Sequence, residues 1–212
     1  MEKFENLPVT KQQKIRNAAL SEFAENGYDQ ASTNRIVKQA EIGKGMLFYY
    51  FKNKKELHEY LIGYSLDFFL TKYLLLVDLK ETDFIKRLQQ AAQVKMTAQV
   101  ENKHVFDFMG TLMLSQELKM PPHLEERFQQ LQQQGYALMY EGIDRSLFRK
   151  DVDTAKAFNL IRWGIDGYQQ EILRKLQGRK MSKVNFEPYW NEFYEYLEIL
   201  RKSFYANEEE TS

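Results

Sequence analysis

Two stripes of apolar residues near the C-terminal end constrain the fold more than any other feature. Residues that recur at intervals of three and four lie on one face of an α-helix. Because both stripes keep nearly heptad spacing, each helix needs helical partners at a shallow crossing angle. The first stripe consists of Phe158, Ile161, Ile165, Tyr168, Ile172 and Leu176, and the second of Trp190, Phe193, Leu197, Leu200 and Phe204.

Helical spacing continues through most of the 212 residues, which contain only four prolines and ten glycines. No stretch of useful length alternates as a β-strand does, so we predict an all-α fold. Gly27 is expected to end the first long helix, and Ser32 or Thr33 to cap the next. Helices are predicted at residues 9–26, 32–40, 44–50, from 54 onward, 83–100, 103–118, 122–142, 158–176 and 190–204.

The last predicted helix is apolar on a second side, where Tyr189, Tyr194, Tyr196 and Ile199 lie outside the main stripe. Two apolar sides need two partners, and a two-fold dimer built as a four-helix bundle would supply the second one. The alternative is a helix fully buried within a monomer. The dimer interpretation assigns the interface to Ile161, Ile165, Tyr168, Ile172, Trp190, Phe193, Leu197 and Leu200.

Several classes of function find no support in the composition. The chain has no cysteine, which excludes thiol nucleophiles, disulfides and cysteine-bound zinc. Its three histidines are far apart in sequence, and neither a phosphate-binding glycine loop nor a serine elbow is present. No apolar run approaches the ~18 residues of a membrane-spanning helix, and the N-terminal segment lacks the features of a signal peptide. We therefore expect a cytoplasmic protein that is not an enzyme and needs no cofactor or metal.

A formal net charge of zero conceals a local excess of basic residues. Between residues 35 and 55 six basic side chains face a single acid, Glu41. A basic cluster of this kind indicates contact with nucleic-acid phosphates. The six are Arg35, Lys38, Lys44, Lys52, Lys54 and Lys55.

The same segment has the pattern of a helix-turn-helix, in which the second helix enters the major groove of DNA. Ala40 is small enough for the two helices to cross, Ile42 supplies an apolar plug in the turn, and Gly43 opens the second helix. Leu47 and Phe51 are expected to pack inward, whereas Tyr49 and Tyr50 are expected to face DNA. The pattern leaves the direction of Phe48 open.

The stretch STNRIVKQAEIGKGMLFYYFKNKKEL, preceded by IRNAALSEFAENGYDQ, resembles the DNA-binding domain of the TetR family of bacterial transcriptional regulators. The resemblance is close over residues 12 to 60 and thins beyond residue 80. It implies about nine helices, with a DNA-binding domain at residues 1–53 and a ligand-binding and dimerisation domain at residues 54–212. It also implies a homodimer that represses transcription from a palindromic operator until a small molecule releases it. The matching positions are Ile15, Ala19, Phe23, Gly27, Thr33, Ile36, Ala40, Ile42, Gly45, Leu47, Phe51, Lys54 and Leu57.

The resemblance also implies roles for individual residues. Thr33 matches a position that caps the second helix and touches phosphate, and Asn34 a position that contacts base or phosphate. Lys54 matches a lysine that reaches a phosphate from the start of the fourth helix. The residues expected at base edges or at the DNA backbone are Lys44, Gly45, Met46, Tyr49 and Tyr50.

Two positions depart from the family's pattern. Phe48 stands where a tyrosine is usual, which removes a hydroxyl that would contact phosphate, and Glu41 stands where glycine is usual. If the turn needs a positive φ at position 41, glutamate is strained there. These departures keep open a second interpretation, an adaptor or co-regulator that has lost autonomous operator binding.

The segment from Met96 to Tyr168 is rich in methionine and aromatic residues, which suit an apolar ligand pocket. A packed core is the simpler interpretation of the same pattern. The pocket interpretation predicts a small lipophilic effector. The interior of this part of the chain offers few charges, with the acids Glu141, Asp166 and Glu171 as the candidate exceptions, which favours a neutral or cationic effector. The candidate ligand-binding residues are Met96, Phe106, Met109, Met113, Tyr136, Met139, Tyr140 and Trp163.

Overall fold

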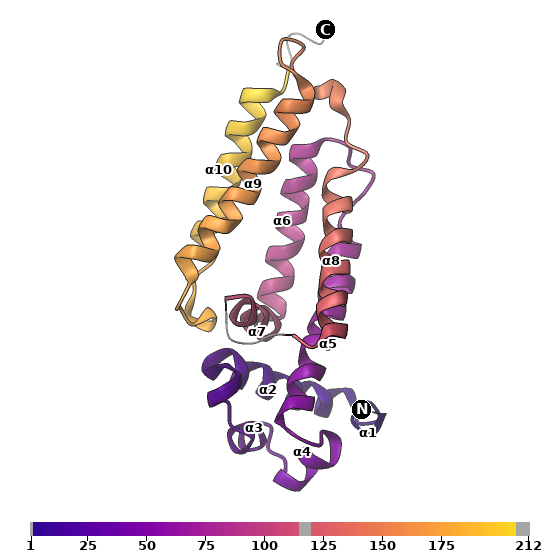
Figure 1. The fold of residues 1–212 in the computed structure, drawn as a ribbon, viewed down its shortest axis with the longest axis vertical. Helices are drawn as coiled ribbons and strands as arrows, with labels where there is room; N and C mark the ends of the chain where they lie inside the picture. Colours follow the sequence, from indigo (N-terminus) through magenta and orange to yellow (C-terminus); the bar gives the residue numbers. More distant parts are fainter. Residues whose placement is uncertain (1, 115–119, 207–212) are drawn as a thin grey trace. The chain divides into compact units, whose positions relative to one another are not determined.

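The computed structural model describes residues 2–114 and 120–206, and in this part of the chain all regular structure is helical. The predicted all-α fold is confirmed (Figure 1). The α-helices are α1 Glu2–Glu5, α2 Val9–Gln30, α3 Thr33–Gln39, α4 Lys44–Tyr50, α5 Lys54–Lys72, α6 Phe84–Glu101, α7 Lys103–Leu114, α8 Pro122–Tyr140, α9 Thr154–Leu176 and α10 Glu187–Phe204. Short 3₁₀ helices occupy η1 Leu74–Leu76, η2 Arg145–Leu147 and η3 Met181–Lys183.

Most predicted helices agree with the observed ones to within a few residues. Gly27 interrupts α2 with a φ of 65°, as expected for a left-handed residue that ends a helix. Ser32 takes the N-cap position of α3, although its side chain makes no capping hydrogen bond. The last residues of the helix predicted at 103–118 fall outside the described residues. Helix α1 was not predicted.

The described chain divides into two compact units, each with a core of its own. The first unit comprises Met1–Lys72, Ala98–Leu131 and Gly178–Val184, and the second Tyr73–Thr97, Gln132–Gln177 and Asn185–Ser212. These units follow packing, so the first extends beyond the DNA-binding segment and includes α5 and α7. The functional boundary between residues 53 and 54 stays a prediction.

The core of the first unit forms where α2 packs on α3, α5 and α7. Ile15 and Leu20 of α2 are fully buried, as are Ile36 of α3 and Leu61 of α5. The short helices α3 and α4 therefore take their stability from this shared core, because helices of seven residues are unstable alone. The core fixes the position of α4 relative to α2.

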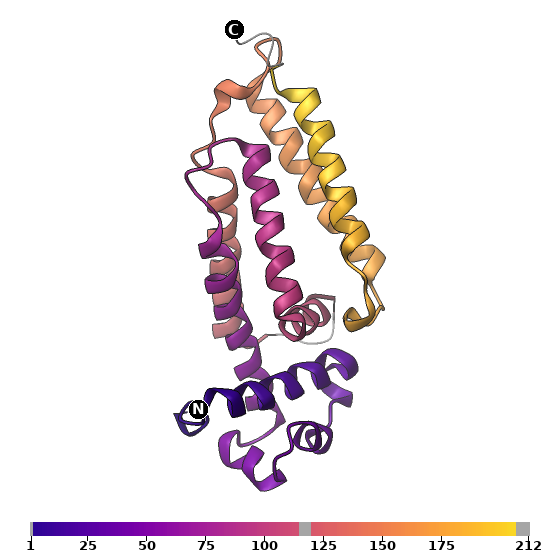
Figure 2. The same cartoon turned by 180° about the vertical axis from the view of Figure 1, so that it is seen from behind.

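In the second unit α9 and α10 lie side by side, as both views show (Figures 1 and 2). Ile161 of α9 and Leu197 of α10 have no exposed surface, and they share a core with Phe84 and Ile85 of α6. The side chain of Arg87 is also buried here, and its guanidinium donates hydrogen bonds to four backbone carbonyl groups. The two apolar stripes thus find helical partners within the chain itself.

Candidate nucleic-acid interface

The turn between α3 and α4 has the geometry of a helix-turn-helix. Ala40 is buried where the two helices meet, and the amide of Ile42 donates to the carbonyl of Val37 at 3.0 Å. Ile42 packs on the core of the first unit, as predicted for an apolar plug. Gly43 adopts φ −71°, a conformation open to any residue, so its backbone does not require glycine.

The positive φ of this turn falls instead on Glu41, at 53°. Its carboxylate forms an ion pair with Lys14 of α2. The hydrogen bond from Lys14, and then its charge, lower the pKa of Glu41. Because Lys14 engages the one acid of the segment, less negative charge opposes the approach of a phosphate.

Helix α4 has one buried face and one exposed face. Leu47 and Phe51, the residue after its last turn, are each 1% exposed, so their predicted inward packing is confirmed. Tyr49 is 61% exposed and Phe48 39% exposed, which settles the direction of Phe48. Tyr50 is only 9% exposed, so the prediction that it faces outward was wrong.

The first turn of α4 exposes Lys44 and Gly45, whereas Met46 is partly buried against the core. A Cβ added to Gly45 would meet nothing within 4 Å, so packing within the chain does not demand glycine there. On α3, Asn34 is exposed and Thr33 is partly buried. Four of the eight predicted contact residues, Asn34, Lys44, Gly45 and Tyr49, are therefore exposed on α3 and α4.

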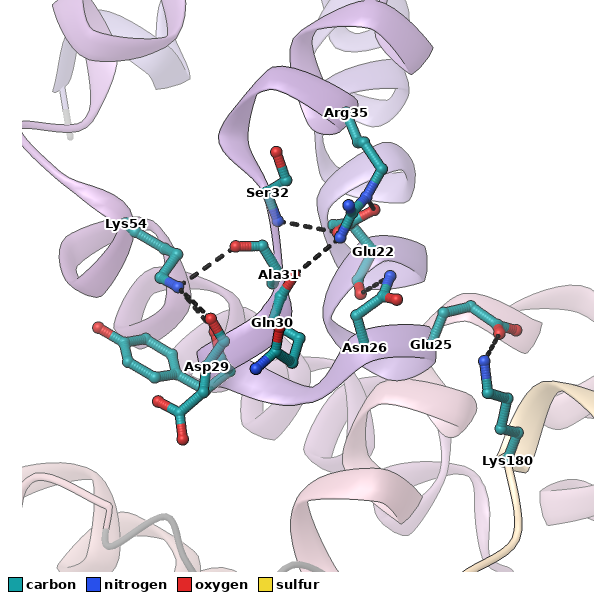
Figure 3. Close-up of polar contacts among 11 residues, drawn as sticks. Glu22, Glu25, Asn26, Asp29, Gln30, Ala31, Ser32, Arg35, Lys54 and Lys180 are labelled. Atoms are coloured by element: carbon teal, nitrogen blue, oxygen red, sulfur yellow. Dashed lines mark hydrogen bonds and ion pairs between the residues drawn. The ribbon is translucent and has the colours of Figure 1, made fainter.

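A buried carboxylate fixes α3 against α2 (Figure 3). Glu22 is 6% exposed and accepts hydrogen bonds from the Arg35 guanidinium and from the Ser32 backbone amide at 2.9 Å. Arg35 also donates to the carbonyl of Gln30 at 2.8 Å. Sequence reasoning did not find Glu22; the available signal was an acid next to Phe23 on the apolar face of α2. A charge in that position needs a partner, and Arg35 supplies it.

Lys54 also has a structural role (Figure 3). Its ammonium group donates to the carbonyls of Tyr28, Asp29 and Ala31 at 2.8, 3.1 and 3.2 Å, and it lies 4.8 Å from the centroid of the Tyr28 ring. These carbonyls follow the break in α2 at Gly27 and lack helical partners. The assignment of Lys54 to a DNA phosphate therefore does not fit this geometry, because its donors are already used.

The other lysines of the basic segment stay accessible. Lys38, Lys44 and Lys52 are exposed and make no ion pair with another described residue. Lys55 is exposed and lies 3.8 Å from Glu59, one turn further along α5. An exposed pair of this kind is weak and can exchange for a phosphate. The accessible basic charge thus lies on α3, on α4 and in the turn that follows α4.

The predicted ligand-binding residues are not gathered in one unit. Phe106, Met109 and Met113 belong to the first unit, where Met109 is buried and Met113 exposed. The rest belong to the second unit, where Trp163 is 58% exposed. There the rings of Tyr136 and Tyr140 lie 4.6 Å apart, Met139 is partly buried, and the sulfur of Met96 accepts a hydrogen bond from Tyr194.

The predicted dimer residues divide into buried and partly buried groups. Ile161, Ile165, Phe193 and Leu197 are buried in the core of the second unit, so a second copy cannot reach them without rearrangement. The apolar stripes that contain these residues pack against one another and against α6 of the same chain. The remaining four, Tyr168, Ile172, Trp190 and Leu200, are partly buried.

Neither a metal site nor a membrane span emerges from the described residues. No group of three or more histidine or acidic side chains among residues 2–114 and 120–206 could hold a metal ion. Within the same ranges, every helix is too short or too polar to cross a bilayer.

Comparison with known proteins identifies the N-terminal region. Residues 15–61 match the family described as bacterial regulatory proteins, tetR family. This domain belongs to the TetR family. The match contains α3, the turn and α4, and membership agrees with the prediction that the chain is not an enzyme.

Curated relatives of the TetR-type domain include an HTH-type transcriptional regulator of Staphylococcus aureus strain USA300. It is 41% identical over 61 residues, which cover 29% of this chain and 33% of the relative. The chain therefore aligns with about a third of the length of this relative.

Solved structures extend the likeness of fold to nearly the whole chain. A TetR family transcriptional regulator from Chloroflexus aurantiacus has a TM-score of 0.60 at 23% identity, covering 98% of this chain and 99% of the other. The regulator FadR from Bacillus subtilis, in complex with stearoyl-CoA, has a TM-score of 0.52 at 21% identity, covering 87% and 96%. These likenesses establish the TetR fold for both parts of the chain.

Proposed function

We propose that this protein is a DNA-binding transcriptional regulator that inserts α4 into the major groove of duplex DNA. The observation that carries the proposal is the division of α4 into two faces. Leu47, Tyr50 and Phe51 anchor the helix to the core, while Lys44 and Tyr49 project from it. A recognition helix needs both a fixed position and accessible side chains near its N-terminus.

Individual side chains suit different parts of DNA. Lys38, Lys44 and Lys52 are free to neutralise phosphates, which supply most of the sequence-independent affinity. Tyr49 offers a flat apolar ring for thymine methyl groups, and Asn34 an amide for base or backbone. Thr33, in the first turn of α3, can donate its hydroxyl to a phosphate.

Gly45 provides a separate argument. Its surroundings within the chain are open, so packing does not explain why the residue lacks a side chain. A glycine on an exposed helix turn costs stability relative to alanine. Close approach of the DNA backbone to this turn would account for it, since a Cβ would then stand between the two surfaces.

The proposal includes a homodimer on a palindromic operator. On α9, Leu160 and Trp163 are exposed, and they form one stripe with Gly164 and Gly167, where an added Cβ would meet nothing within 4 Å. On the adjoining α10, Tyr196 and Ile199 are exposed as well. These six residues, the outer stripe, offer a second copy apolar side chains and room for close helix approach.

The proposal also includes repression that a small lipophilic effector relieves, with the effector bound in the domain at residues 54–212. In the second unit, the Tyr140 ring lies 5.6 Å from the Phe84 ring and 6.1 Å from the Phe158 ring, measured between centroids. Burial, and then the charge of Asp166, raise the pKa of the Tyr140 hydroxyl. Nearby, Arg162 has a buried Nε with no hydrogen-bond partner among the described residues. An effector that accepts a hydrogen bond would satisfy this donor, which disfavours a cationic ligand.

The same fold holds stearoyl-CoA in the Bacillus subtilis regulator FadR, which supports an effector site in a chain of this architecture. A cytoplasmic location follows from the proposed DNA-binding role. The matched residues 15–61 contain α3 and α4 and extend into α5, and the proposal keeps the functional boundary near residue 53, between α4 and α5.

The proposed function is tested by titrating duplex DNA at several salt concentrations and following fluorescence anisotropy. We expect log affinity to fall steeply and linearly with log salt concentration. Lys44→Gln should flatten this slope, whereas Lys72→Gln, at the far end of α5, should leave it unchanged. A folded wild-type protein that binds no duplex at low salt would contradict the proposal and favour the adaptor interpretation.

A further inference from the structure

The short helix α1 is attached firmly to the DNA-binding helices by one aromatic side chain. Phe4 has no exposed surface, and its ring contacts three others from α4, the turn after it and α5. The ring centroids lie 5.8 Å from Tyr50, 5.0 Å from Phe51 and 5.3 Å from Tyr60. Contacts of this kind contribute stability beyond the burial of area alone. Because its ring is fully enclosed, Phe4 fixes the position of α1 beside α4.

Polar contacts hold the end of α1 as well. The side-chain amide of Gln12, on α2, donates to the carbonyl of Glu5 at 2.8 Å and to the carbonyl of Leu7 at 2.9 Å. The guanidinium group of Arg16 donates to Oε1 of the Gln12 side chain at 2.9 Å and to the hydroxyl of Tyr60 at 3.1 Å. Gln12 is therefore oriented by Arg16, and it satisfies the last carbonyl of α1 and one carbonyl of the turn that follows α1.

Lys3, adjacent to Phe4, reaches the exposed face of α4. Its Nζ lies 4.3 Å from the centroid of the Tyr49 ring, a cation–π contact. Both side chains are exposed. Among the described residues Lys3 forms no ion pair, so its positive charge beside Tyr49 is open to an anion.

We propose that α1 is part of the DNA-reading surface, and that Lys3 contacts a backbone phosphate next to the base pair read by Tyr49. This inference rests on the proposed function. DNA that touches the Tyr49 ring comes within reach of the Lys3 ammonium group, because the two are already in contact. In free protein Lys3 orders the ring, and in the complex its charge neutralises a phosphate.

The test measures salt-dependent binding of the full chain to one duplex, between about 0.05 and 0.3 M potassium chloride. Each phosphate contact contributes about 0.9 to the slope of log affinity against log salt concentration. Lys3→Gln should therefore flatten the slope by about 0.9 per bound chain and weaken binding several-fold at about 0.1 M salt. Lys3→Arg should keep the wild-type slope and the wild-type affinity, because it keeps the charge. Phe4→Ala, which releases α1, should reproduce the slope of Lys3→Gln even where it also lowers the melting temperature.

The controls separate this inference from the proposed function. Lys72→Gln removes the same charge at a distance and should keep the wild-type slope. If Lys3→Gln keeps that slope while Lys44→Gln flattens it, the proposed function stands and the role of Lys3 is wrong. If neither substitution changes the slope, the placement of DNA on α4 is wrong as well. A wild-type protein that binds no duplex overturns both.

Discussion

Tyr49 and Tyr50 are adjacent in the sequence but have opposite surroundings. Successive residues of an α-helix point about 100° apart, so only one of two neighbours can face a given surface. Tyr50 packs edge-on against Phe4, whereas the Lys3 ammonium group lies over the exposed ring of Tyr49. The sequence pattern could not separate them, because a helix of seven residues contains too few turns to define a face. The burial of Tyr50 was decided by Phe4, a residue far away in the sequence.

We predict different effects for alanine at these two positions. Tyr50→Ala should lower the free energy of unfolding by about 3 kcal/mol, because it leaves a cavity against Phe4. Tyr49→Ala should leave stability within about 0.5 kcal/mol of wild type and change the order in which duplex sequences are preferred. Urea denaturation and competition binding measure the two effects. Equal loss of stability in both variants would contradict the assignment of faces.

The first two turns of α5 join the end of α2 to the rest of the first unit. Lys54 binds the carbonyls that follow Gly27, and His58, one turn later, is 4% exposed between the rings of Phe23, Tyr28 and Phe108. The family resemblance assigned Lys54 to phosphate, and this was the natural interpretation of a lysine in a basic segment. The carbonyl groups that engage it could not be predicted, since their position depends on the break in α2.

Replacing Lys54 tests its structural role. Lys54→Met keeps the apolar stem but removes three hydrogen bonds, and should lower the free energy of unfolding by about 2 kcal/mol. The salt slope for DNA binding should not change in the folded variant. Lys55→Met, at the exposed neighbour, serves as the control and should change stability by less than about 0.5 kcal/mol. A Lys54→Met protein of wild-type stability with a flattened slope would restore the phosphate assignment.

His58 should make the stability of the first unit depend on pH. Burial, and then the charge of Lys54, lower its pKa from 6.5 to about 4. Between these values the unfolded chain binds a proton that the folded chain does not, so stability falls as pH falls through this window. The contribution of neutral His58 to the free energy of unfolding is fully present above pH 6.5, and about 3 kcal/mol of it is lost by pH 4.

The check is urea denaturation between about pH 4 and 7. His58→Phe should flatten the dependence in this window, because an aromatic ring without a titrating group fits between the same neighbours. His123→Gln, at an exposed histidine, should retain the wild-type profile. An unchanged profile in the His58→Phe variant would show that other groups cause the acid sensitivity.

For the molecule as a whole, the sequence predicted the all-α class and the position of nearly every helix, because apolar spacing determines both. It did not predict which helices cover which stripes. Ile161 and Leu197 were assigned to a partner chain, but α6 supplies enough apolar surface to bury them within one chain. Helix α1 was missed for a related reason: four residues are too few to show a helical period, and Phe4 is buried by contacts with rings that are distant in the sequence.

The proposed dimer makes a prediction about the outer stripe. Trp163→Asp combined with Ile199→Asp should yield a folded monomer, because both side chains are exposed in the single chain. Leu197→Asp should instead unfold the second unit, because it places a charge in a fully buried position. Light scattering and circular dichroism distinguish the two results. A folded dimer in the double variant would move the interface away from the outer stripe.

The most direct test of the central claim is selection of tight-binding duplexes from a random library, followed by sequencing. We predict enrichment of a two-fold palindrome, whose half-sites lie one or more helical turns apart, as two α4 helices of a dimer require. Variants in which Lys44 or Tyr49 is replaced should bind the enriched duplexes more weakly than the wild-type protein does. If the folded, dimeric protein enriches no sequence, the account of an operator-binding regulator is contradicted.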